Sequence, residues 1–212
     1  MEEAARRARY AFLGRTALRI GASAIAVGHN ADDQTETILM HWLRGAGLAG
    51  LRGMLPATPL ASLRIEPADS QAFADSNISI IRPLLEVPRA EIASYCTAYG
   101  LQPRFDRSNL DTTYFRNRLR HKLIPLLEEY NPQFREVLRR SARIIADDYE
   151  LLRTLADHAW TQISLREDDR SIAFDLRAWR QLHPSPQRST IREAIHRLRR
   201  SLRNISWIHV EN

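Results

Sequence analysis

The chain lacks the cysteines that a disulfide-built fold or a cysteine zinc site would need, since Cys96 is its only cysteine. One cysteine forms no internal disulfide, so the sequence favours a reducing compartment and predicts no metal site. No apolar run approaches the roughly 20 residues that span a bilayer, and the charged residues 1–10 contain no signal-peptide core. The sequence therefore predicts a soluble, cytoplasmic protein in which Cys96 is a core residue of a helix.

Positive charge exceeds negative charge along the chain. Its 212 residues include 31 Lys and Arg against 25 Asp and Glu, which gives a net charge of +6 and a pI near 10.1. With 44% apolar residues, there is enough apolar content for a buried core in one large domain or two small ones. A basic chain suits a polyanionic partner, although basic solvated faces are also common in proteins that bind none.

The first part of the sequence alternates between helix and strand patterns, which favours an α/β domain. The predicted elements are helices at residues 2–20, 30–44 and 89–99 and buried strands at residues 24–28 and 78–81. Asn30 is a predicted N-cap, because Asp32 and Asp33 follow in the first turn, where carboxylates complement the helix dipole. Four glycines within residues 45–53 predict a turn-rich stretch.

After Asp111 the pattern becomes mainly helical. The predicted elements are an arginine-rich helix at residues 112–130 kinked by Pro125, a long helix beginning at Pro132 with Asn131 as cap, a short strand at residues 172–176, and a last helix beginning at Pro186 with Ser185 as cap. Apolar pairs recur every seven residues along the long helix, which predicts a stripe that packs against other helices. We expect a domain boundary near residue 131, between domains at residues 1–130 and 131–212.

The densest polar cluster lies where the first strand ends and a helix begins. Ligands of open α/β sheets bind at the carboxyl ends of strands, so His29, Asp33 and Glu36 are candidates to face a substrate. Asp33 and Glu36 are three residues apart, hence on one helical face, where two carboxylates can hold an ammonium group or accept hydrogen bonds from an amine. The alternative is that Asn30 and Asp33 only cap the helix, and the residues alone leave the two interpretations about equal.

A second cluster lies in the arginine-rich helix. Arg116 and Arg120 are one helical turn apart, as are Arg118 and Lys122, and such pairs can bind phosphates. The alternative is a solvated face paired with acidic neighbours, namely Asp106, Asp111 and Glu128. Arg6 and Arg9, three apart near the amino end, also suit an anion.

Five motifs, in the same order along the chain, resemble the tRNA(Ile)-lysidine synthase family of N-type ATP pyrophosphatases. They are Glu2–Tyr10, Gly28–Thr37, Arg44–Leu48 with Gly50–Leu51, Arg82–Leu85, and Asp106–Asn109 followed by Arg116–His121. The resemblance implies an α/β fold: part of a Rossmann-like parallel-sheet nucleotide-binding domain over residues 1–130, followed by an incomplete helical tRNA-binding domain over residues 131–212.

The resemblance also implies an activity and its site. In this family ATP adenylates the wobble cytidine of the CAU-anticodon isoleucine tRNA, and the lysine amine then displaces AMP; the partners are this tRNA, L-lysine and ATP with Mg²⁺, with a homodimer as a further expectation. Asp33 and Glu36 would orient cytosine and amine beside His29, while Arg9 would contact phosphate or the adenylated intermediate. Residues expected to stabilise the site or bind tRNA are Arg116, Asn117, Arg118, Arg120 and His121.

One family motif is missing from this sequence. The Ser-Gly-Gly-x-Asp-Ser loop that wraps the ATP phosphates has no counterpart, and the glycines of residues 45–53 follow a helix instead of opening one. The expectation is therefore a family member without its front part, inactive on its own. The alternatives are a noncatalytic RNA-binding remnant, or a tRNA thiolation enzyme of the same group, against which the single Cys96 argues.

Overall fold

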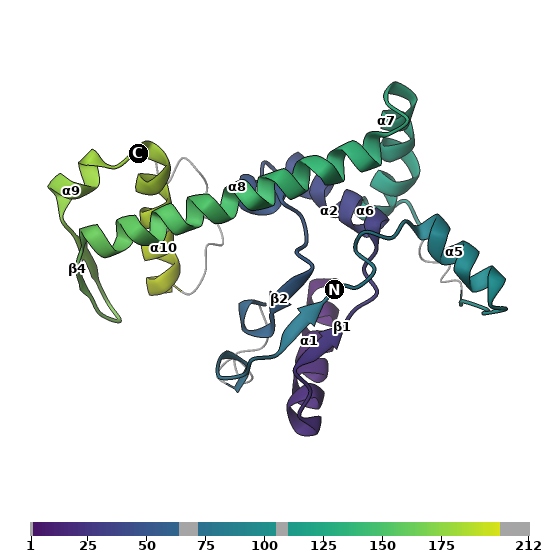
Figure 1. Ribbon diagram of the computed structural model, residues 1–212, viewed down its shortest axis with the longest axis horizontal. Coiled ribbons are helices and arrows are strands. Elements are labelled where there is room, and N and C mark those ends of the chain that lie inside the picture. The colour runs from purple at the N-terminus through teal and green to yellow at the C-terminus, as the bar shows by residue number, and fades with distance from the viewer. Residues whose placement is uncertain (1, 64–71, 105–109, 200–212) are drawn as a thin grey trace. The chain divides into compact units, whose positions relative to one another are not determined.

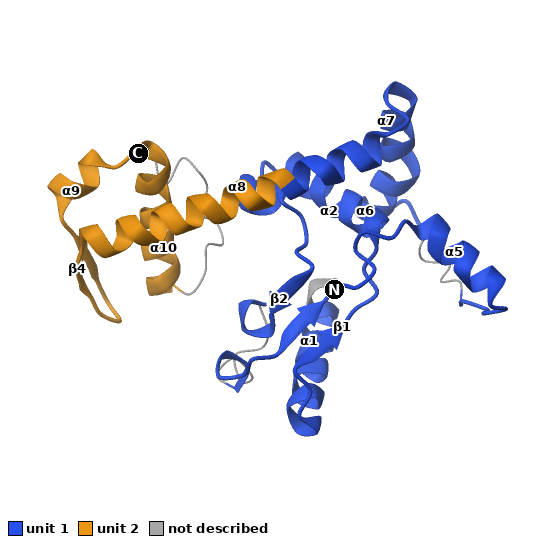
Figure 2. Cartoon of the chain, viewed as in Figure 1, with its two compact units in different colours: residues 1–143 blue, residues 144–212 orange. Residues whose placement is uncertain are grey.

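The computed structural model describes residues 2–63, 72–104 and 110–199, and the chain divides into two compact units (Figure 2). Unit 1 comprises residues 1–143 and unit 2 residues 144–212. The division falls inside one continuous helix, α8, about a dozen residues beyond the boundary expected from the sequence. Among the described residues, no helix is both long and apolar enough to cross a bilayer.

Unit 1 combines a small sheet with several helices (Figure 1). Its elements are α1 (Glu2–Ile20), β1 (Ala24–Ala26), α2 (Ala31–Leu43), α3 (Leu48–Leu51), β2 (Ala57–Pro59), the 3-10 turn η1 (Leu60–Ser62), β3 (Ser79–Ile81), α5 (Arg89–Ala98), α6 (Phe115–Arg118), the π-helical turn η3 (Leu119–Leu123), α7 (Ile124–Tyr130) and the start of α8 (Phe134–Ile163).

The sheet of unit 1 is mixed and has the order β1-β3-β2. The parallel pairing of β1 with β3 confirms the parallel arrangement predicted for these two strands, and Ala26 lies opposite Ile81. The antiparallel strand β2 corrects the all-parallel expectation, because a three-residue strand that includes Pro59 carries no strand pattern of its own. Pairing with β3 holds it in place. The carboxyl ends of β1 and β3 meet at one edge.

Helix α1 packs on this sheet through a buried apolar cluster. The cluster consists of Tyr10, Ala17, Ile25, Leu60, Phe73, Ile78 and Ile80. Gly14 lets the helix approach, because a Cβ atom at this position would lie 2.6 Å from the Phe73 ring and 2.9 Å from Leu60. The predicted helix at residues 2–20 is confirmed. Its contact with the sheet holds β1 and β3 in position.

The arginine-rich helix starts later than predicted and is interrupted. Helical structure begins at Phe115 instead of residue 112, and η3 inserts a π-helical turn before Pro125. Proline has no N–H to donate, and its ring crowds the carbonyl four residues earlier. The wider π-helical turn accommodates Pro125 at the position where a kink was predicted. This segment packs on α2 through the buried side chains of Leu39, Leu119 and Ile124.

The long helix α8 begins at Phe134, two residues after the predicted start. The Gln133 N–H donates to Asn131 Oδ1 at 3.0 Å, so Asn131 does cap this turn, but residues 132–133 form a turn before the helix. Unit 2 contains the rest of α8, the antiparallel strands β4 (Ser164–Glu167) and β5 (Ile172–Phe174), and the helices α9 (Leu176–Gln181) and α10 (Pro184–Arg199). The strand predicted at residues 172–176 is confirmed as β5, whereas its partner β4 was not predicted.

Candidate functional site

Helix α2 begins directly after β1 with a complete capping box. Asn30 Oδ1 accepts hydrogen bonds from the backbone N–H groups of Asp32 and Asp33 at 3.0 and 3.1 Å. Asp33 Oδ2 in turn accepts the Asn30 N–H at 3.1 Å, which satisfies two backbone donors reciprocally. The predicted cap is confirmed. It fixes the start of α2 and therefore the direction in which the side chains of the next turn point.

Glu36 is a fully buried carboxylate held by two arginines. Its side chain is 0% exposed, Oε2 accepts Arg116 Nε–H at 2.6 Å, and Oε1 accepts Arg120 Nε–H at 2.6 Å. Arg120 Nη2 donates a further hydrogen bond to Oε2 at 3.1 Å. An unpaired buried carboxylate costs several kcal/mol, and these charge-assisted hydrogen bonds offset that cost.

Asp33 serves the cap and the arginines at the same time. While Oδ2 takes the backbone N–H of Asn30, Oδ1 lies 3.3 Å from Arg116 Nη2, 3.6 Å from Arg89 Nη2 and 3.8 Å from Arg120 Nη2. Its side chain is 16% exposed. The cap and the convergent carboxylate pair are therefore both present, and three guanidinium groups surround two carboxylates.

The partners of the arginines differ from those considered for a solvated face. Arg116 and Arg120 bind acids of α2 that lie 80 or more residues earlier, while Glu128 pairs with Arg135 at 2.7 Å. Asp111 accepts the backbone N–H of Thr113 at 2.9 Å, and hydrogen bonds with the side chain and then the backbone of Thr113 lower the pKa of Asp111. Asp106 lies outside the described residues.

His29 lies beside this cluster, between β1 and the cap. Its Nδ1 atom is buried and has no hydrogen-bond partner in the described part of the chain. Burial lowers the pKa of His29 below its ordinary value of 6.5; the charge of Asp33 raises it, and the charges of Arg82, Arg6 and Arg116 lower it further. The neutral imidazole is therefore the favoured form near pH 7.

Arg82 follows β3 and was predicted only as part of the motif Arg82–Leu85, not as a site residue. Its side chain is buried, at 6% exposure, and Nη1 donates to the Leu55 carbonyl at 2.7 Å and to Thr58 Oγ1 at 2.9 Å. Nε has no partner among the residues described, and burial lowers the Arg82 pKa. An arginine directly after a buried strand was the available signal, since that position lies at the ligand-binding edge of a sheet.

The other predicted site residues lie on α1, α6 and η3. Arg9 is exposed on α1 and makes no hydrogen bond or ion pair with described residues. Asn117 is buried and donates to the Asp111 carbonyl at 2.8 Å. Arg118 is exposed, with its guanidinium 5.6 Å from the Phe115 ring centroid, and His121 is exposed as well. The structure thus gathers His29, Asp33, Glu36, Arg116 and Arg120.

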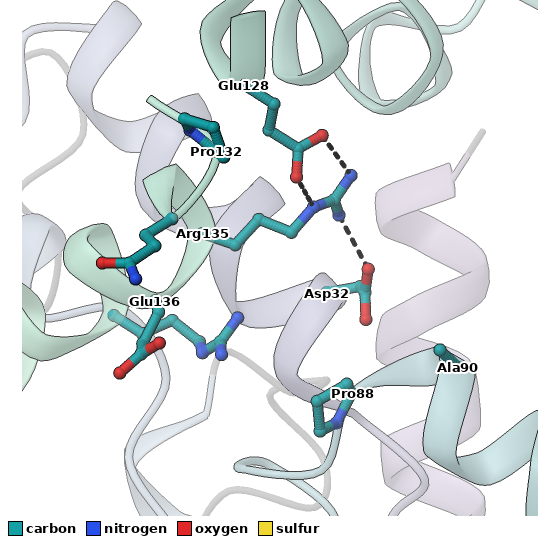
Figure 3. A pocket seen from close by; sticks show the side chains of 9 residues that line it. Asp32, Pro88, Ala90, Glu128, Pro132, Arg135 and Glu136 are labelled. Carbon is teal, nitrogen blue, oxygen red and sulfur yellow. Dashed lines mark hydrogen bonds and ion pairs between the residues drawn. The ribbon is translucent and has the colours of Figure 1, made fainter. Parts of the chain in front are cut away.

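A pocket of about 330 Å³ lies near the start of α2, in unit 1 (Figure 3). Figure 3 shows Arg135 between two acids: its Nη1 lies 2.7 Å from Asp32 and its Nε 2.7 Å from Glu128. The hydrogen bond with Glu128 raises the Arg135 pKa. Asp32 also accepts the Arg89 backbone N–H at 2.8 Å, so these polar groups tie α8 and α5 to the start of α2.

No three His, Cys, Asp or Glu side chains in the described ranges lie close enough to hold a metal ion. The cluster instead offers nitrogen donors: the guanidinium groups around Asp33 and Glu36, and the unpartnered Nε–H of Arg82. Such donors suit oxyanions such as phosphates and carboxylates.

Comparison with known proteins identifies the family. Residues 1–127 match the model of the PP-loop domain. The tRNA(Ile)-lysidine synthase of Dehalococcoides mccartyi (strain CBDB1) is 38% identical over 213 residues, covering 100% of this chain and 43% of the relative. That of Geobacter sulfurreducens is 36% identical over 211 residues, covering 100% of this chain and 41% of the relative.

The chain therefore spans less than half of the length of these two curated relatives. The similarity extends over its whole length and confirms the resemblance that the ordered motifs predicted. Since the family model covers residues 1–127, more than half of the sequence, the chain belongs to the PP-loop domain family.

Proposed function

We propose that this chain is part of a tRNA(Ile)-lysidine synthase, which uses ATP to ligate lysine to the wobble cytidine of the isoleucine tRNA with a CAU anticodon. The names of the similar proteins and the PP-loop match support the reaction class. The observation that carries the proposal is the placement of Asp33 and Glu36, with Arg116 and Arg120, just beyond the carboxyl end of a parallel strand.

The proposed reaction has two steps. The cytosine C2 oxygen attacks the α-phosphorus of ATP, and the bond to pyrophosphate breaks. The ε-amine of lysine then attacks C2, the C2–oxygen bond breaks, AMP leaves, and the amine loses a proton. The ε-ammonium of lysine and the phosphate group of the adenylated cytidine must therefore come together at C2, and the ammonium gives up a proton before its nitrogen attacks.

Paired acids and arginines suit this meeting of charges. In the structure Asp33 and Glu36 neutralise Arg116 and Arg120. On substrate binding, the lysine amine would share the carboxylates and the phosphate group would share the guanidinium groups, so each charged reactant replaces part of an existing pair. Preorganised charges of this kind stabilise a transition state without reorganisation of water.

ATP is the proposed co-substrate, with Mg²⁺ accompanying its phosphates. The guanidinium groups of the cluster fit phosphate oxygens. Since the described residues offer no metal cluster, we assign Mg²⁺ to the nucleotide and no reaction step to the metal. The basic chain, with Arg118 and His121 exposed beside the cluster, supports tRNA as the polyanionic partner.

A lysine-ligation assay tests the proposal. Radiolabelled lysine, ATP and a transcript of the CAU-anticodon isoleucine tRNA are incubated with the 212-residue chain, and with the same chain preceded by a strand and Ser-Gly-Gly-x-Asp-Ser loop from a family member. We expect lysine incorporation from the extended protein and none from the chain alone. Extended protein that binds the tRNA and transfers no lysine would support the noncatalytic RNA-binding alternative instead.

Variants of the carboxylates test their roles in the extended protein. Asp33→Asn and Glu36→Gln should each reduce incorporation about 100-fold, the lower range for removing a positioned catalytic group. Glu86→Gln is the matched control, because Glu86 is 55% exposed and pairs only loosely with Arg143 at 3.4 Å. Far-ultraviolet circular dichroism checks that each variant is folded. Unchanged turnover in folded Asp33→Asn would rule out its proposed role.

A further inference from the structure

Two buried side-chain nitrogens at neighbouring strand ends have no partner among the described residues. They are Arg82 Nε, directly after β3, and His29 Nδ1, three residues after β1. Ala26 pairs with Ile81, and the Val27 N–H donates to the Ile81 carbonyl at 3.0 Å, so the backbone brings the two positions to one edge of the sheet.

The hydrogen bonds that Arg82 makes within the fold come from Nη1 and not from Nε. Nη1 bonds the Leu55 carbonyl and Thr58 Oγ1, which holds the segment around β2 against β3. This leaves Nε–H, on a side chain only 6% exposed, as a buried donor without an acceptor in the described chain. Such donors are rare in folded proteins and call for a ligand or a bound water.

The electrostatic surroundings favour an anion as that ligand. Three arginines, Arg82, Arg6 and Arg116, and one acid, Asp33, act on His29 through their charges. Arg6 also acts on Arg82. Asp33 and Glu36 match the charge of Arg116, so the positive charges that remain to act on this edge are those of Arg82 and Arg6, and these charges attract an anion.

We propose that Arg82 and His29 form an oxyanion subsite, in which Arg82 Nε–H donates to an oxygen of a carboxylate or phosphate group and the His29 ring lies beside the same group. The inference deepens the proposed function and rests on it for the source of the oxyanion. The proposed reaction supplies two: the α-carboxylate of lysine and the phosphates of the nucleotide.

The direct test observes the Arg82 Nε–H resonance of the ¹⁵N-labelled chain by NMR, assigned from its loss in Arg82→Lys. The probes are L-lysine, L-lysinamide, which lacks the carboxylate, and inorganic pyrophosphate. A shift with lysine and none with lysinamide identifies a carboxylate subsite; a shift with pyrophosphate alone identifies a phosphate subsite. If none of the three probes moves this resonance, the subsite does not exist.

Affinity measurements on variants supply the second arm. Arg82→Lys keeps a positive charge and a donor for Leu55 but has no Nε–H, so the dissociation constant of the responding probe should rise about tenfold, the effect of one charge-assisted hydrogen bond. Arg143→Lys, at an exposed arginine of α8, is the control and should leave that constant unchanged. Equal affinities in folded Arg82→Lys and the unsubstituted chain contradict the proposal.

The two proposals fail separately. Probe binding at Arg82 in a protein that transfers no lysine leaves the subsite standing and removes the proposed reaction. Lysine transfer by a protein whose Arg82 resonance ignores every probe removes only the subsite.

Discussion

At the scale of single residues, the central feature is Glu36, because a fully buried carboxylate is stable only with its two arginines. Arg116 and Arg120 approach it from a segment 80 or more positions away in sequence, so the pairing also ties α6 and η3 to α2. The same group thus contributes to the fold and to the candidate site.

Replacing Glu36 by Gln should strongly destabilise unit 1. The variant removes the carboxylate that both guanidinium groups contact at 2.6 Å, and breaking a buried ion pair in this way costs about 3–5 kcal/mol. Urea denaturation measures the loss. The control Glu86→Gln removes an exposed pair and should cost less than about 1 kcal/mol. Similar losses in both variants would show that the Glu36 pair gives no special stability.

His29 should make the folded state sensitive to acid. Burial, together with Arg82, Arg6 and Arg116, lowers its pKa in the folded state against the opposing charge of Asp33. Below pH 6.5 the unfolded chain then binds more protons than the folded chain, so the free energy of unfolding falls as pH falls, and above pH 6.5 His29 has no effect.

Denaturation curves across this pH window check the expectation. His29→Gln should flatten the decline below pH 6.5, while His158→Gln, at an exposed histidine of α8, should leave it as it is. A decline that persists unchanged in His29→Gln assigns the acid sensitivity to other groups.

At the scale of elements, the sequence was informative wherever the signal was local. The cap of α2 was readable because Asn30, Asp32 and Asp33 are neighbours, and α1 because its composition extends over many residues. Strand β2 was not readable, since three residues that include Pro59 become a strand only through pairing with β3. The carboxylate–arginine pairs of the site were hidden for the same reason, because they join distant segments.

The contact between α1 and the sheet depends on the absence of a side chain at Gly14. In an exposed helix, Gly→Ala stabilises by up to about 1 kcal/mol through helix propensity. Here the added Cβ would lie 2.6 Å from the Phe73 ring, which is 1% exposed and belongs to the buried apolar cluster. Gly14→Ala should therefore destabilise by about 1–3 kcal/mol, the usual cost of overpacking a core.

Thermal unfolding of two alanine variants separates these effects. Gly47→Ala places a Cβ where nothing lies within 4 Å, and it should change the melting temperature little. A Gly14→Ala protein that melts at or above the temperature of the unsubstituted chain would mean that α1 can shift away from the sheet without penalty.

At the scale of the whole molecule, the net charge of +6 means that the proposed tRNA binding should depend on salt concentration. Each phosphate that a protein cation neutralises releases counterions, so the logarithm of the binding constant falls with the logarithm of salt concentration by about 0.7–0.9 per contact. The arginines differ in their freedom to make such contacts. Arg116 is engaged by Glu36 at 2.6 Å, whereas Arg118 is exposed beside Phe115.

Salt titrations of tRNA binding should therefore distinguish Arg118 from Arg116, which the sequence alone does not distinguish. Arg118→Gln should lower the salt slope by about one unit, because it removes one phosphate contact. Arg116→Gln should leave the slope almost unchanged and reduce stability instead, since its charge is already matched by Glu36 and Asp33. The opposite result, a lower slope only in Arg116→Gln, would mean that tRNA displaces the carboxylates from Arg116, and that the buried pairs open when the nucleic acid binds.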